Sequence, residues 1–325
     1  MKLSIVGEFG LIRSISSLCG TSESPVLLGI GDDAAAMTFK ANTVLATTDM
    51  LIEGIHFDLN YTKFFQLGYK TLAVNISDIA AMGGQPEFFL LSLGIPPFFE
   101  TEWIEDLYKG INELAIKTQV HVAGGDTCSS RSGSFILSGT LLGSTNKVIS
   151  RGGAQVGDKI CVTNYLGESA AGLALLQVHG NTANFAHKSF DRNKFELFEP
   201  LIHRHLMPTP RFLTDTAKVT AMIDISDGLL QDLGHICDQS RKGAKIYLNN
   251  IPISDTLKKA AQYLKHNPLD FALSGGEDYE LLFTSSEPLE DCFTIGEIIE
   301  KERIIVDKNN RAIPTGFNKG YDHFQ

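Results

Sequence analysis

The chain has 325 residues, which is enough for two domains because a single hydrophobic core rarely grows beyond about 250 residues. Its formal net charge of −10 excludes the broad basic surface that nucleic acid needs. The five cysteines are scattered and form no C-x-x-C pair, so we expect neither a disulfide framework nor a zinc site. A reducing cytoplasm fits this cysteine usage.

A membrane location is not expected. Glu8 and Arg13 stand where a signal peptide needs an unbroken apolar core. The longest apolar run, at 88–99, is interrupted by Pro96 and Pro97 and is well short of the roughly 18 residues that a membrane span needs.

The first half of the chain predicts a mixed sheet with helices. After an opening amphipathic helix, apolar β-branched runs predict strands, and longer periodic stretches predict helices. Glycines are expected to make a tight turn at the end of the fourth strand. The expected strands are 26–39, 43–57, 87–96, 120–127 and 134–144, and the expected helices are 64–82 and 101–119.

A basic residue and three glycines around 150–157 suggest a domain boundary, giving domains at 1–150 and 151–325. The second half predicts a helix at 169–179, a polar connection at 180–196, and a strand at 219–226 that leads into a helix. Ser226 is expected to cap that helix, which should begin near Gly228, and to turn its amide groups toward an anion.

Seven aspartates lie at predicted strand ends, turns and helix starts or on an apolar helix. If several of them converge, each carboxylate pair about 4 Å apart repels by about 4 kcal/mol at an effective dielectric constant of 20. Such a cluster demands cations, and oxygen ligands without cysteine or histidine favour Mg²⁺. These residues are Asp32, Asp33, Asp49, Asp78, Asp126, Asp224 and Asp227.

The alternative is that each aspartate only caps a helix or tightens a loop. Capping explains neither Asp49, which lies beside Thr48 inside a predicted strand, nor Asp78. The latter shares one face of the predicted helix at 64–82 with Thr71 and Asn75. A buried, unpaired carboxylate at either place would cost several kcal/mol.

Two glycine pairs, Gly124–Gly125 and Gly275–Gly276, would let the backbone approach a polyphosphate, although each pair alone also fits a plain turn. The sequence contains no Walker A motif, no protein-kinase H-R-D motif and no G-x-S-x-G motif. The commonest nucleotide-binding and hydrolase folds are therefore not indicated.

An ordered set of motifs resembles the thiamine-monophosphate kinases, which belong to the PurM-like (AIR synthetase-like) ATP-binding superfamily. The motifs span nearly the whole chain and read GEFGLI, GIGDDAA, TTDML, GIHF, YKTLAVNISDIAAMGG, GGDT, SRGGAQVGD, PTPR, DISDGLLQDLGHI, SGGEDYELLF and GYDHF.

The resemblance implies transfer of the γ-phosphoryl group of ATP onto the phosphate of thiamine monophosphate, with several Mg²⁺ ions, to give thiamine diphosphate. It also implies an α/β and α+β fold of two domains. The N-terminal ATP- and metal-binding domain would form a barrel with its counterpart across a homodimer, and the C-terminal domain would be α+β. Neither nucleic acid nor a membrane is an expected partner.

The resemblance further implies roles for individual residues. The implied metal ligands are Asp33, Thr47, Thr48, Asp49, Asp78, Asp126, Asp224 and Asp227, with Asp32 beside them. The implied ATP contacts are Tyr108, Gly125, Asp126, Arg151 and Ser226. The implied substrate contacts are His56, Glu277 and Tyr321, with Phe324 as the alternative to Tyr321. The implied catalytic residues are Asp78, Asp126 and Arg151.

Two alternatives remain at this point. One is a sister enzyme that shares the ATP site, such as selenophosphate synthetase or aminoimidazole ribonucleotide synthetase, and the other is a metal-binding protein without turnover. Cys19 stands outside the glycine-rich arrangement that selenophosphate synthetase needs. His203 and His205 flank Arg204 outside every motif, and we interpret them as solvated loop residues rather than metal ligands.

Overall fold

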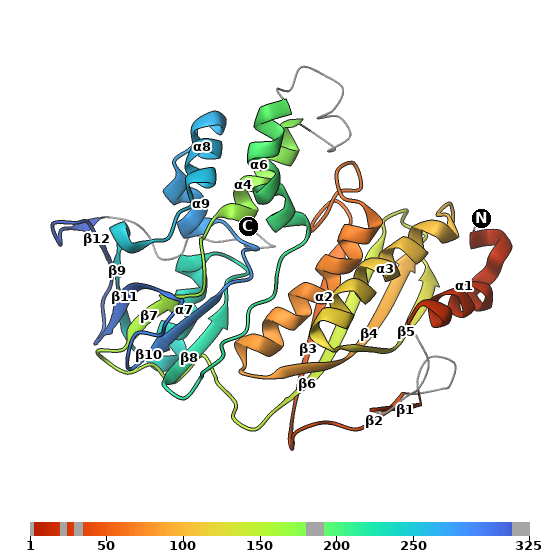
Figure 1. Ribbon diagram of the computed structural model, residues 1–325, viewed down its shortest axis with the longest axis horizontal. Helices are drawn as coiled ribbons and strands as arrows, with labels where there is room; N and C mark the ends of the chain where they lie inside the picture. Colours follow the sequence, from red (N-terminus) through yellow and green to blue (C-terminus); the bar gives the residue numbers. More distant parts are fainter. Residues whose placement is uncertain (1–2, 20–24, 29–34, 180–191, 314–325) are drawn as a thin grey trace. The chain divides into compact units, whose positions relative to one another are not determined.

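The computed structural model describes residues 3–19, 25–28, 35–179 and 192–313, and it divides into two compact units (Figure 1). The first unit comprises Met1–Ala80 and Gly84–Lys147, and the second comprises Ala81–Gly83 and Val148–Gln325. Each unit has its own sheet and its own buried core.

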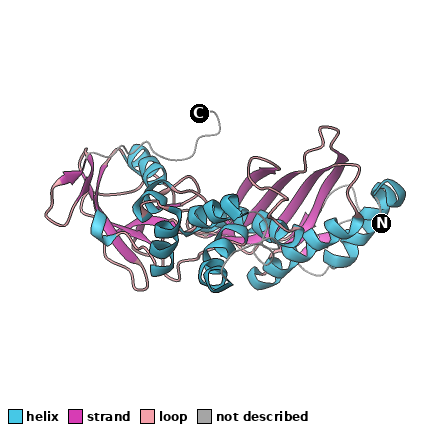
Figure 2. Cartoon of the chain, turned by 90° about the horizontal axis from the view of Figure 1, so that it is seen from above, coloured by secondary structure: helices cyan, strands magenta, loops and turns pink. Residues whose placement is uncertain are grey.

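The first unit is built on a four-stranded sheet in the order β3 (Thr43–Ile52), β6 (Ile136–Thr145), β4 (Gln85–Ile95) and β5 (His121–Ser129). Strands β4 and β5 are parallel and the other pairs are antiparallel, so the sheet is mixed as predicted. Helices α2 (Phe64–Ala81) and α3 (Thr101–Thr118) lie on one side of these strands (Figures 1 and 2). Helix α1 (Leu3–Cys19) packs on α3, and β1 (Val26–Leu28) pairs with β2 (Ala36–Met37).

Helices α2 and α3 touch at two glycines. A Cβ on Gly68 would lie 1.9 Å from the carbonyl oxygen of Leu107, and a Cβ on Gly110 would lie 1.9 Å from that of Phe65. Each glycine therefore allows the backbone of one helix to rest against the other. This close approach keeps α2 firmly over the sheet, which matters because α2 carries Asn75 and Asp78.

The second unit contains a seven-stranded sheet in which only β12 and β9 are parallel. Its strand order is β13 (Ala312–Ile313), β12 (Arg303–Val306), β9 (Gly243–Tyr247), β11 (Phe293–Ile299), β7 (Lys159–Val162), β10 (Leu281–Ser285) and β8 (Val219–Asp224). Its helices are α4 (Glu168–His179), α6 (Arg192–Leu206), α7 (Leu229–Ser240), α8 (Asp255–Leu264), α9 (Pro268–Ser274) and a 3₁₀ turn, η1 (Leu248–Asn250).

The helices predicted at 64–82 and 101–119 are confirmed, because their apolar residues recur with helical spacing. Four local predictions are wrong. The stretch predicted as one strand at 26–39 contains two short strands, β1 and β2, which pair antiparallel. Helix α6 begins at Arg192, inside the segment expected to be a polar connection. Strand β5 continues through Gly124 and Gly125 to Ser129 instead of turning there. Ser226 does not cap α7, whose N-cap is Gly228 with no side-chain cap.

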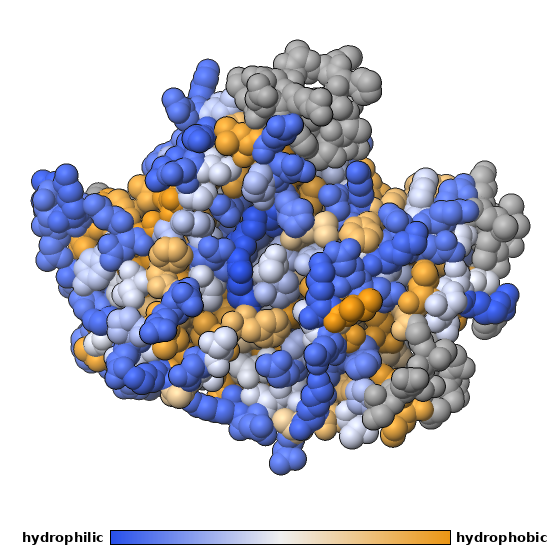
Figure 3. Space-filling model, viewed as in Figure 1, coloured by the Kyte–Doolittle hydropathy of each residue, from blue (hydrophilic) through white to orange (hydrophobic). Residues whose placement is uncertain are grey.

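The surface shows hydrophilic and apolar side chains interspersed over the face seen in Figure 3. Among the residues that the structure describes, no helix combines the length and the apolar character required to cross a membrane.

The glycine contact between α2 and α3 predicts that Gly110→Ala lowers the free energy of unfolding by about 1 to 3 kcal/mol, since the added methyl group has no room. Gly234→Ala in α7 is the matched control. Its Cβ would meet only the end of the Arg303 side chain at 3.6 Å, so the helix propensity of alanine should leave stability unchanged or higher. Urea unfolding of both variants measures the difference, and equal effects would contradict the account.

Candidate functional site

Two carboxylates of the first unit, those of Asp49 and Asp78, interact in a partly buried position on the side of the sheet that the helices cover. Burial and then the charge of Asp78 raise the pKa of Asp49 to about 7. Thr47 lies two residues before Asp49 on the same face of β3, and its hydroxyl donates to Oδ2 of Asp78 at 2.5 Å. The strand and the helix thus meet through charged and polar groups of three residues that the motifs single out.

An unpaired oxygen lies on the same face of α2. The Nδ2 amide of Asn75 donates to the carbonyl oxygen of Thr71 at 2.9 Å, while its Oδ1 is buried and accepts no hydrogen bond within the described residues. A Cβ on Gly139 would lie 2.7 Å from Nδ2 of Asn75, and Gly139 pairs with Asp49 across β3 and β6. Asn75 therefore reaches the position of the carboxylates.

The donor set fits a hard divalent cation. Carboxylate and amide oxygens are the ligands that Mg²⁺ takes in proteins, and a cation would satisfy Oδ1 of Asn75 and relieve the repulsion between Asp49 and Asp78. Asn75 was not among the predicted ligands. Its helical spacing with Asp78 was visible in the sequence, but spacing alone does not distinguish a ligand from a helix-capping or core amide.

Asp126 does not join this pair within the first unit. The cross-strand pairs that start at Asp49 form one row of residues across the sheet, which continues through Gly139 and Leu91 to Gly125. Asp126 pairs with Ser92 and therefore belongs to the next row. Neighbouring rows face opposite sides of a sheet, and three strand spacings separate β3 from β5 by about 14 Å. The expectation that Asp49, Asp78 and Asp126 converge in one cluster is therefore wrong for this unit taken by itself.

The remaining predicted residues of the first unit are dispersed. Tyr108 is only 3% exposed on α3, and burial raises its pKa above the ordinary value. Thr48 faces away from Thr47 and donates to the carbonyl oxygen of Gly139 at 2.9 Å. Nδ1 of His56 accepts the backbone N–H of Ile52 at 3.1 Å at the end of β3. A Cβ on Gly125 would lie 2.0 Å from the carbonyl oxygen of Leu91, so strand packing already requires this glycine.

A second acidic group lies where β8 leads into α7. The carboxylate of Asp232 accepts the backbone N–H groups of Asp227 at 3.1 Å and Gly228 at 3.0 Å. Burial, Asp224 and Asp227 raise the pKa of Asp232 to about 8. Ligand atoms of Asp227, Asp232 and His235 lie within 4.8 Å of one another. Asp232 and His235 were not predicted, although they share one face of α7 at a spacing of three residues.

The segment 275–280 runs beside this turn. The backbone N–H of Glu277 donates to the carbonyl oxygen of Ser226 at 2.7 Å, and that of Tyr279 donates to Ile225 at 2.8 Å. Glu277 and Tyr279 have positive φ angles of 63° and 50°. A Cβ on Gly276 would lie 2.5 Å from the oxygen of Ser226. The second glycine pair therefore serves a close approach between two segments of the chain.

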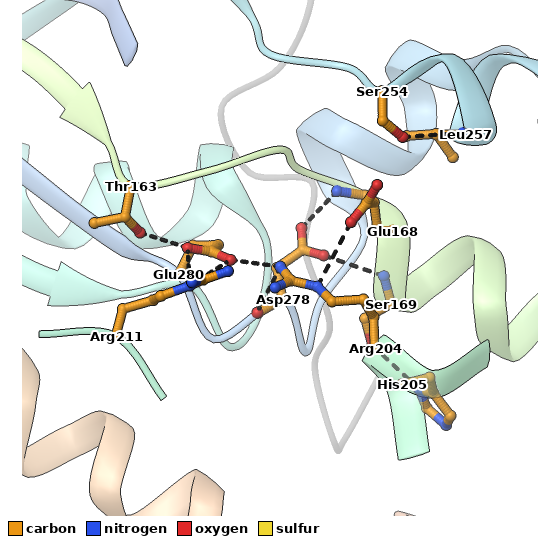
Figure 4. A network of polar contacts seen from close by, with 11 residues as sticks. Thr163, Glu168, Ser169, Arg204, His205, Arg211, Ser254, Leu257, Asp278 and Glu280 are labelled. Atoms are coloured by element: carbon orange, nitrogen blue, oxygen red, sulfur yellow. Dashed lines mark hydrogen bonds and ion pairs between the residues drawn. The ribbon is translucent and has the colours of Figure 1, made fainter. Parts of the chain in front are cut away.

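A buried ionic network anchors the same segment (Figure 4). Glu280 is fully buried and accepts from Arg204 at 2.5 Å, from Arg211 at 3.0 Å and from the hydroxyl of Thr163 at 2.5 Å. Asp278 accepts the backbone N–H groups of Gly167 at 2.6 Å and Ser169 at 3.2 Å. Burial nevertheless raises the pKa of Asp278 to about 7.

His205 was misjudged from the sequence. It lies in α6 rather than in a loop, and it is 3% exposed instead of solvated. Its Nδ1 is 3.2 Å from Oγ of Ser169 and 3.1 Å from Oε2 of Glu277. His203, by contrast, is exposed.

The comparisons with known proteins agree over the whole chain. Residues 31–145 match the N-terminal domain model of the AIR synthase related proteins, and residues 155–309 match the C-terminal one. A thiamine-monophosphate kinase of Aquifex aeolicus is 37% identical over 100% of both chains. The chain belongs to the thiamine-monophosphate kinase family.

Solved structures of this family have the same two-domain α+β fold. The thiamine-monophosphate kinase of Stenotrophomonas maltophilia K279a superimposes with a TM-score of 0.77 and 34% identity, covering 93% of this chain and 95% of the other. AaThiL complexed with AMPPCP and TMP gives a TM-score of 0.76 and 33% identity, covering 100% and 99%.

The motifs of the thiamine-monophosphate kinase family bring residues together within each unit. Thr47, Asp49 and Asp78 meet in the first unit, and Asp224, Ser226, Asp227 and Glu277 are neighbours in the second. Arg151 is exposed in the second unit. Asp32, Asp33, Tyr321 and Phe324 lie outside the described residues.

The raised pKa of Asp49 predicts a pH-dependent stability in the absence of divalent cations. In the folded chain the Asp49 carboxyl group keeps its proton up to about pH 7, whereas in the unfolded chain it loses the proton near its reference pKa of about 3.9. The free energy of unfolding therefore falls as pH rises between these two values. Asp49→Asn should remove this loss and raise the melting temperature at pH 8 by roughly 5 °C.

Thermal melting of both proteins between pH 4.5 and 8, in EDTA and in Mg²⁺, is the measurement. Mg²⁺ should raise the melting temperature of the wild type at pH 8 more than that of Asp49→Asn. Parallel curves for the two proteins would show that the carboxylate carries no electrostatic penalty.

Proposed function

We propose that this chain transfers the γ-phosphoryl group of ATP to the phosphate of thiamine monophosphate, giving thiamine diphosphate and ADP. The observation that carries this function is the full-length relation to thiamine-monophosphate kinases, one of which, AaThiL, has been solved with AMPPCP and TMP. The carboxylate pair of the first unit adds a chemical reason from this chain itself.

The reaction needs charge control more than a general base. The acceptor phosphate has a second pKa of about 6, so at neutral pH it is already an oxyanion. The obstacle is repulsion between two phosphate groups, which positioning and cations relieve. Mg²⁺, when bound, would supply positive charge to the phosphate oxygens.

We assign the Mg²⁺ ligands of the first unit to Asp49, Asp78 and Asn75, with Thr47 holding Asp78 in place through its hydrogen bond. In the second unit, Asp224 and Asp227 are the proposed ligands, and Asp232 orients the turn that carries Asp227. Asp126 lies on the uncovered face, so its proposed role belongs to a separate ion. Arg151 is proposed to bind phosphate oxygens, for which a guanidinium group is suited.

The other proposed contacts follow from the family resemblance. Gly125 and Ser226 would contact ATP, and His56 and Glu277 would contact the thiamine moiety. The Tyr108 side chain is almost fully buried, so it can contact adenine only if the residues packed around its ring move. A cytoplasmic location is part of the same proposal.

A homodimer is also part of the proposal. The face of the four-stranded sheet opposite α2 and α3 carries apolar side chains, including Val44 and Met50, which are 48% and 53% exposed. Pairing of this sheet with a second copy would cover them and form the family's barrel. A dilution series is predicted to lower specific activity as dimers dissociate, and constant activity of the monomer would remove the dimer from the account.

The central prediction is that ADP release depends on thiamine monophosphate, ATP and Mg²⁺ together. Asp78→Asn should lower kcat at least 100-fold, because it weakens charge stabilisation of the transition state. Asp106→Asn is the matched control, since the Asp106 side chain on α3 is 46% exposed and, among the residues that the structure describes, pairs with Lys109 at 3.5 Å. ADP release that does not depend on thiamine monophosphate would favour a sister enzyme. A lack of ADP release under all conditions would favour a metal-binding protein without turnover.

A further inference from the structure

Glu277 occupies an unusual place in the second unit. Its side chain is 26% exposed, while Asp278 and Glu280 on either side of Tyr279 are buried. The backbone at Glu277 has a positive φ angle and is bonded to Ser226. The buried neighbours fix the backbone, but they leave the Glu277 side chain to be oriented by something else.

His205 is a described side chain that contacts the Glu277 carboxylate. Its Nδ1 is 3.1 Å from Oε2 of Glu277, and the imidazole is held in the interior at 3% exposure. An ionised carboxylate only accepts hydrogen bonds, so a hydrogen bond between these two groups requires the proton to be on Nδ1 of His205. The hydroxyl of Ser169, 3.2 Å from the same nitrogen, is then an acceptor or a shared partner.

The position of His205 is itself fixed by the ionic network. The preceding residue, Arg204, donates to Glu280, and Ser169 donates its backbone N–H to Asp278. Helix α6 thus contacts the segment 275–280 in two places. Arg204 binds the buried Glu280, and His205 lies against Glu277. The first set of contacts involves buried acids that anchor the backbone of the segment, whereas the second involves a carboxylate that is partly exposed.

We propose that His205 is a positioning residue for the substrate, which donates a hydrogen bond from Nδ1 to Glu277 and holds its carboxylate toward the thiamine moiety. This inference rests on the proposed function, in which Glu277 contacts thiamine monophosphate. Thiamine offers a thiazolium cation and an aminopyrimidine, and a carboxylate of fixed orientation can attract the one or accept a hydrogen bond from the other.

Steady-state kinetics of six proteins test the proposal: the wild type, His205→Phe, His205→Asn, His203→Phe, Glu277→Gln, and the double variant of His205→Phe with Glu277→Gln. His205→Phe keeps the bulk but loses the donor, and should raise KM for thiamine monophosphate about tenfold, as expected for a hydrogen bond to a charged group. KM for ATP should change less than about twofold, because the proposed contact of Glu277 is with the thiamine moiety and not with ATP.

His205→Asn places an amide donor near the position of Nδ1 and should restore most of the affinity. His203→Phe changes an exposed histidine of the same helix and should behave as the wild type. If His205 acts through Glu277, adding His205→Phe to Glu277→Gln should change KM for thiamine monophosphate little further.

A purely structural role of His205 gives a different pattern. Both KM values would then shift together, kcat would fall with the melting temperature, and the effect would persist in the Glu277→Gln background. An unchanged KM for thiamine monophosphate in either Glu277→Gln or His205→Phe also overturns the proposal. Turnover by the wild type that ignores thiamine monophosphate would instead overturn the proposed function, and this inference with it.

Discussion

The burial of the Asp49 carboxylate beside that of Asp78 is the constraint on which the proposed site of the first unit depends. Register between β3 and β6 sets Gly139 opposite Asp49, and the missing side chain there leaves room for Asn75. Two helix glycines allow α2 and α3 to pack closely, and α2 brings Asn75 and Asp78 over the strand. Ordinary packing forces thus hold together groups that would separate in water, and a divalent cation bound at the proposed site would relieve this penalty.

The second unit positions its functional groups by a different device. Acids in the segment 275–280 are buried, and arginines, a threonine hydroxyl and the N-terminal backbone of α4 satisfy them. Buried ion pairs contribute little net stability, but breaking one is costly, so such a network fixes a single conformation. The conformation fixed here places Glu277 beside the turn at Ser226 and Asp227. In both units, buried charged groups fix the conformation of the residues proposed to bind the cation and the substrate.

Sequence reasoning succeeded where one short-range rule decides the structure. Helical periodicity predicted α2 and α3, and the improbability of a carboxylate in a strand or on an apolar helix singled out Asp49 and Asp78, which interact in the structure. It failed where distant contacts decide. The face of Asp126 depends on an irregularity between Phe89 and Leu90 in the pairing of β4 with β5. The cap expected from Ser226 was displaced by Asp232, and His205 looked solvated because its partners lie 36 and 72 residues away in the chain.

Anomalous diffraction from a crystal soaked with Mn²⁺ and an ATP analogue tests the central claim most directly, because it locates the cation without relying on activity. The account predicts a strong peak about 2.1 Å from carboxylate oxygens of Asp49 and Asp78, with Oδ1 of Asn75 turned toward it. Ordered carboxylates with no peak between them, at a metal concentration that supports turnover, would contradict the claim that these acids are gathered to hold a cation.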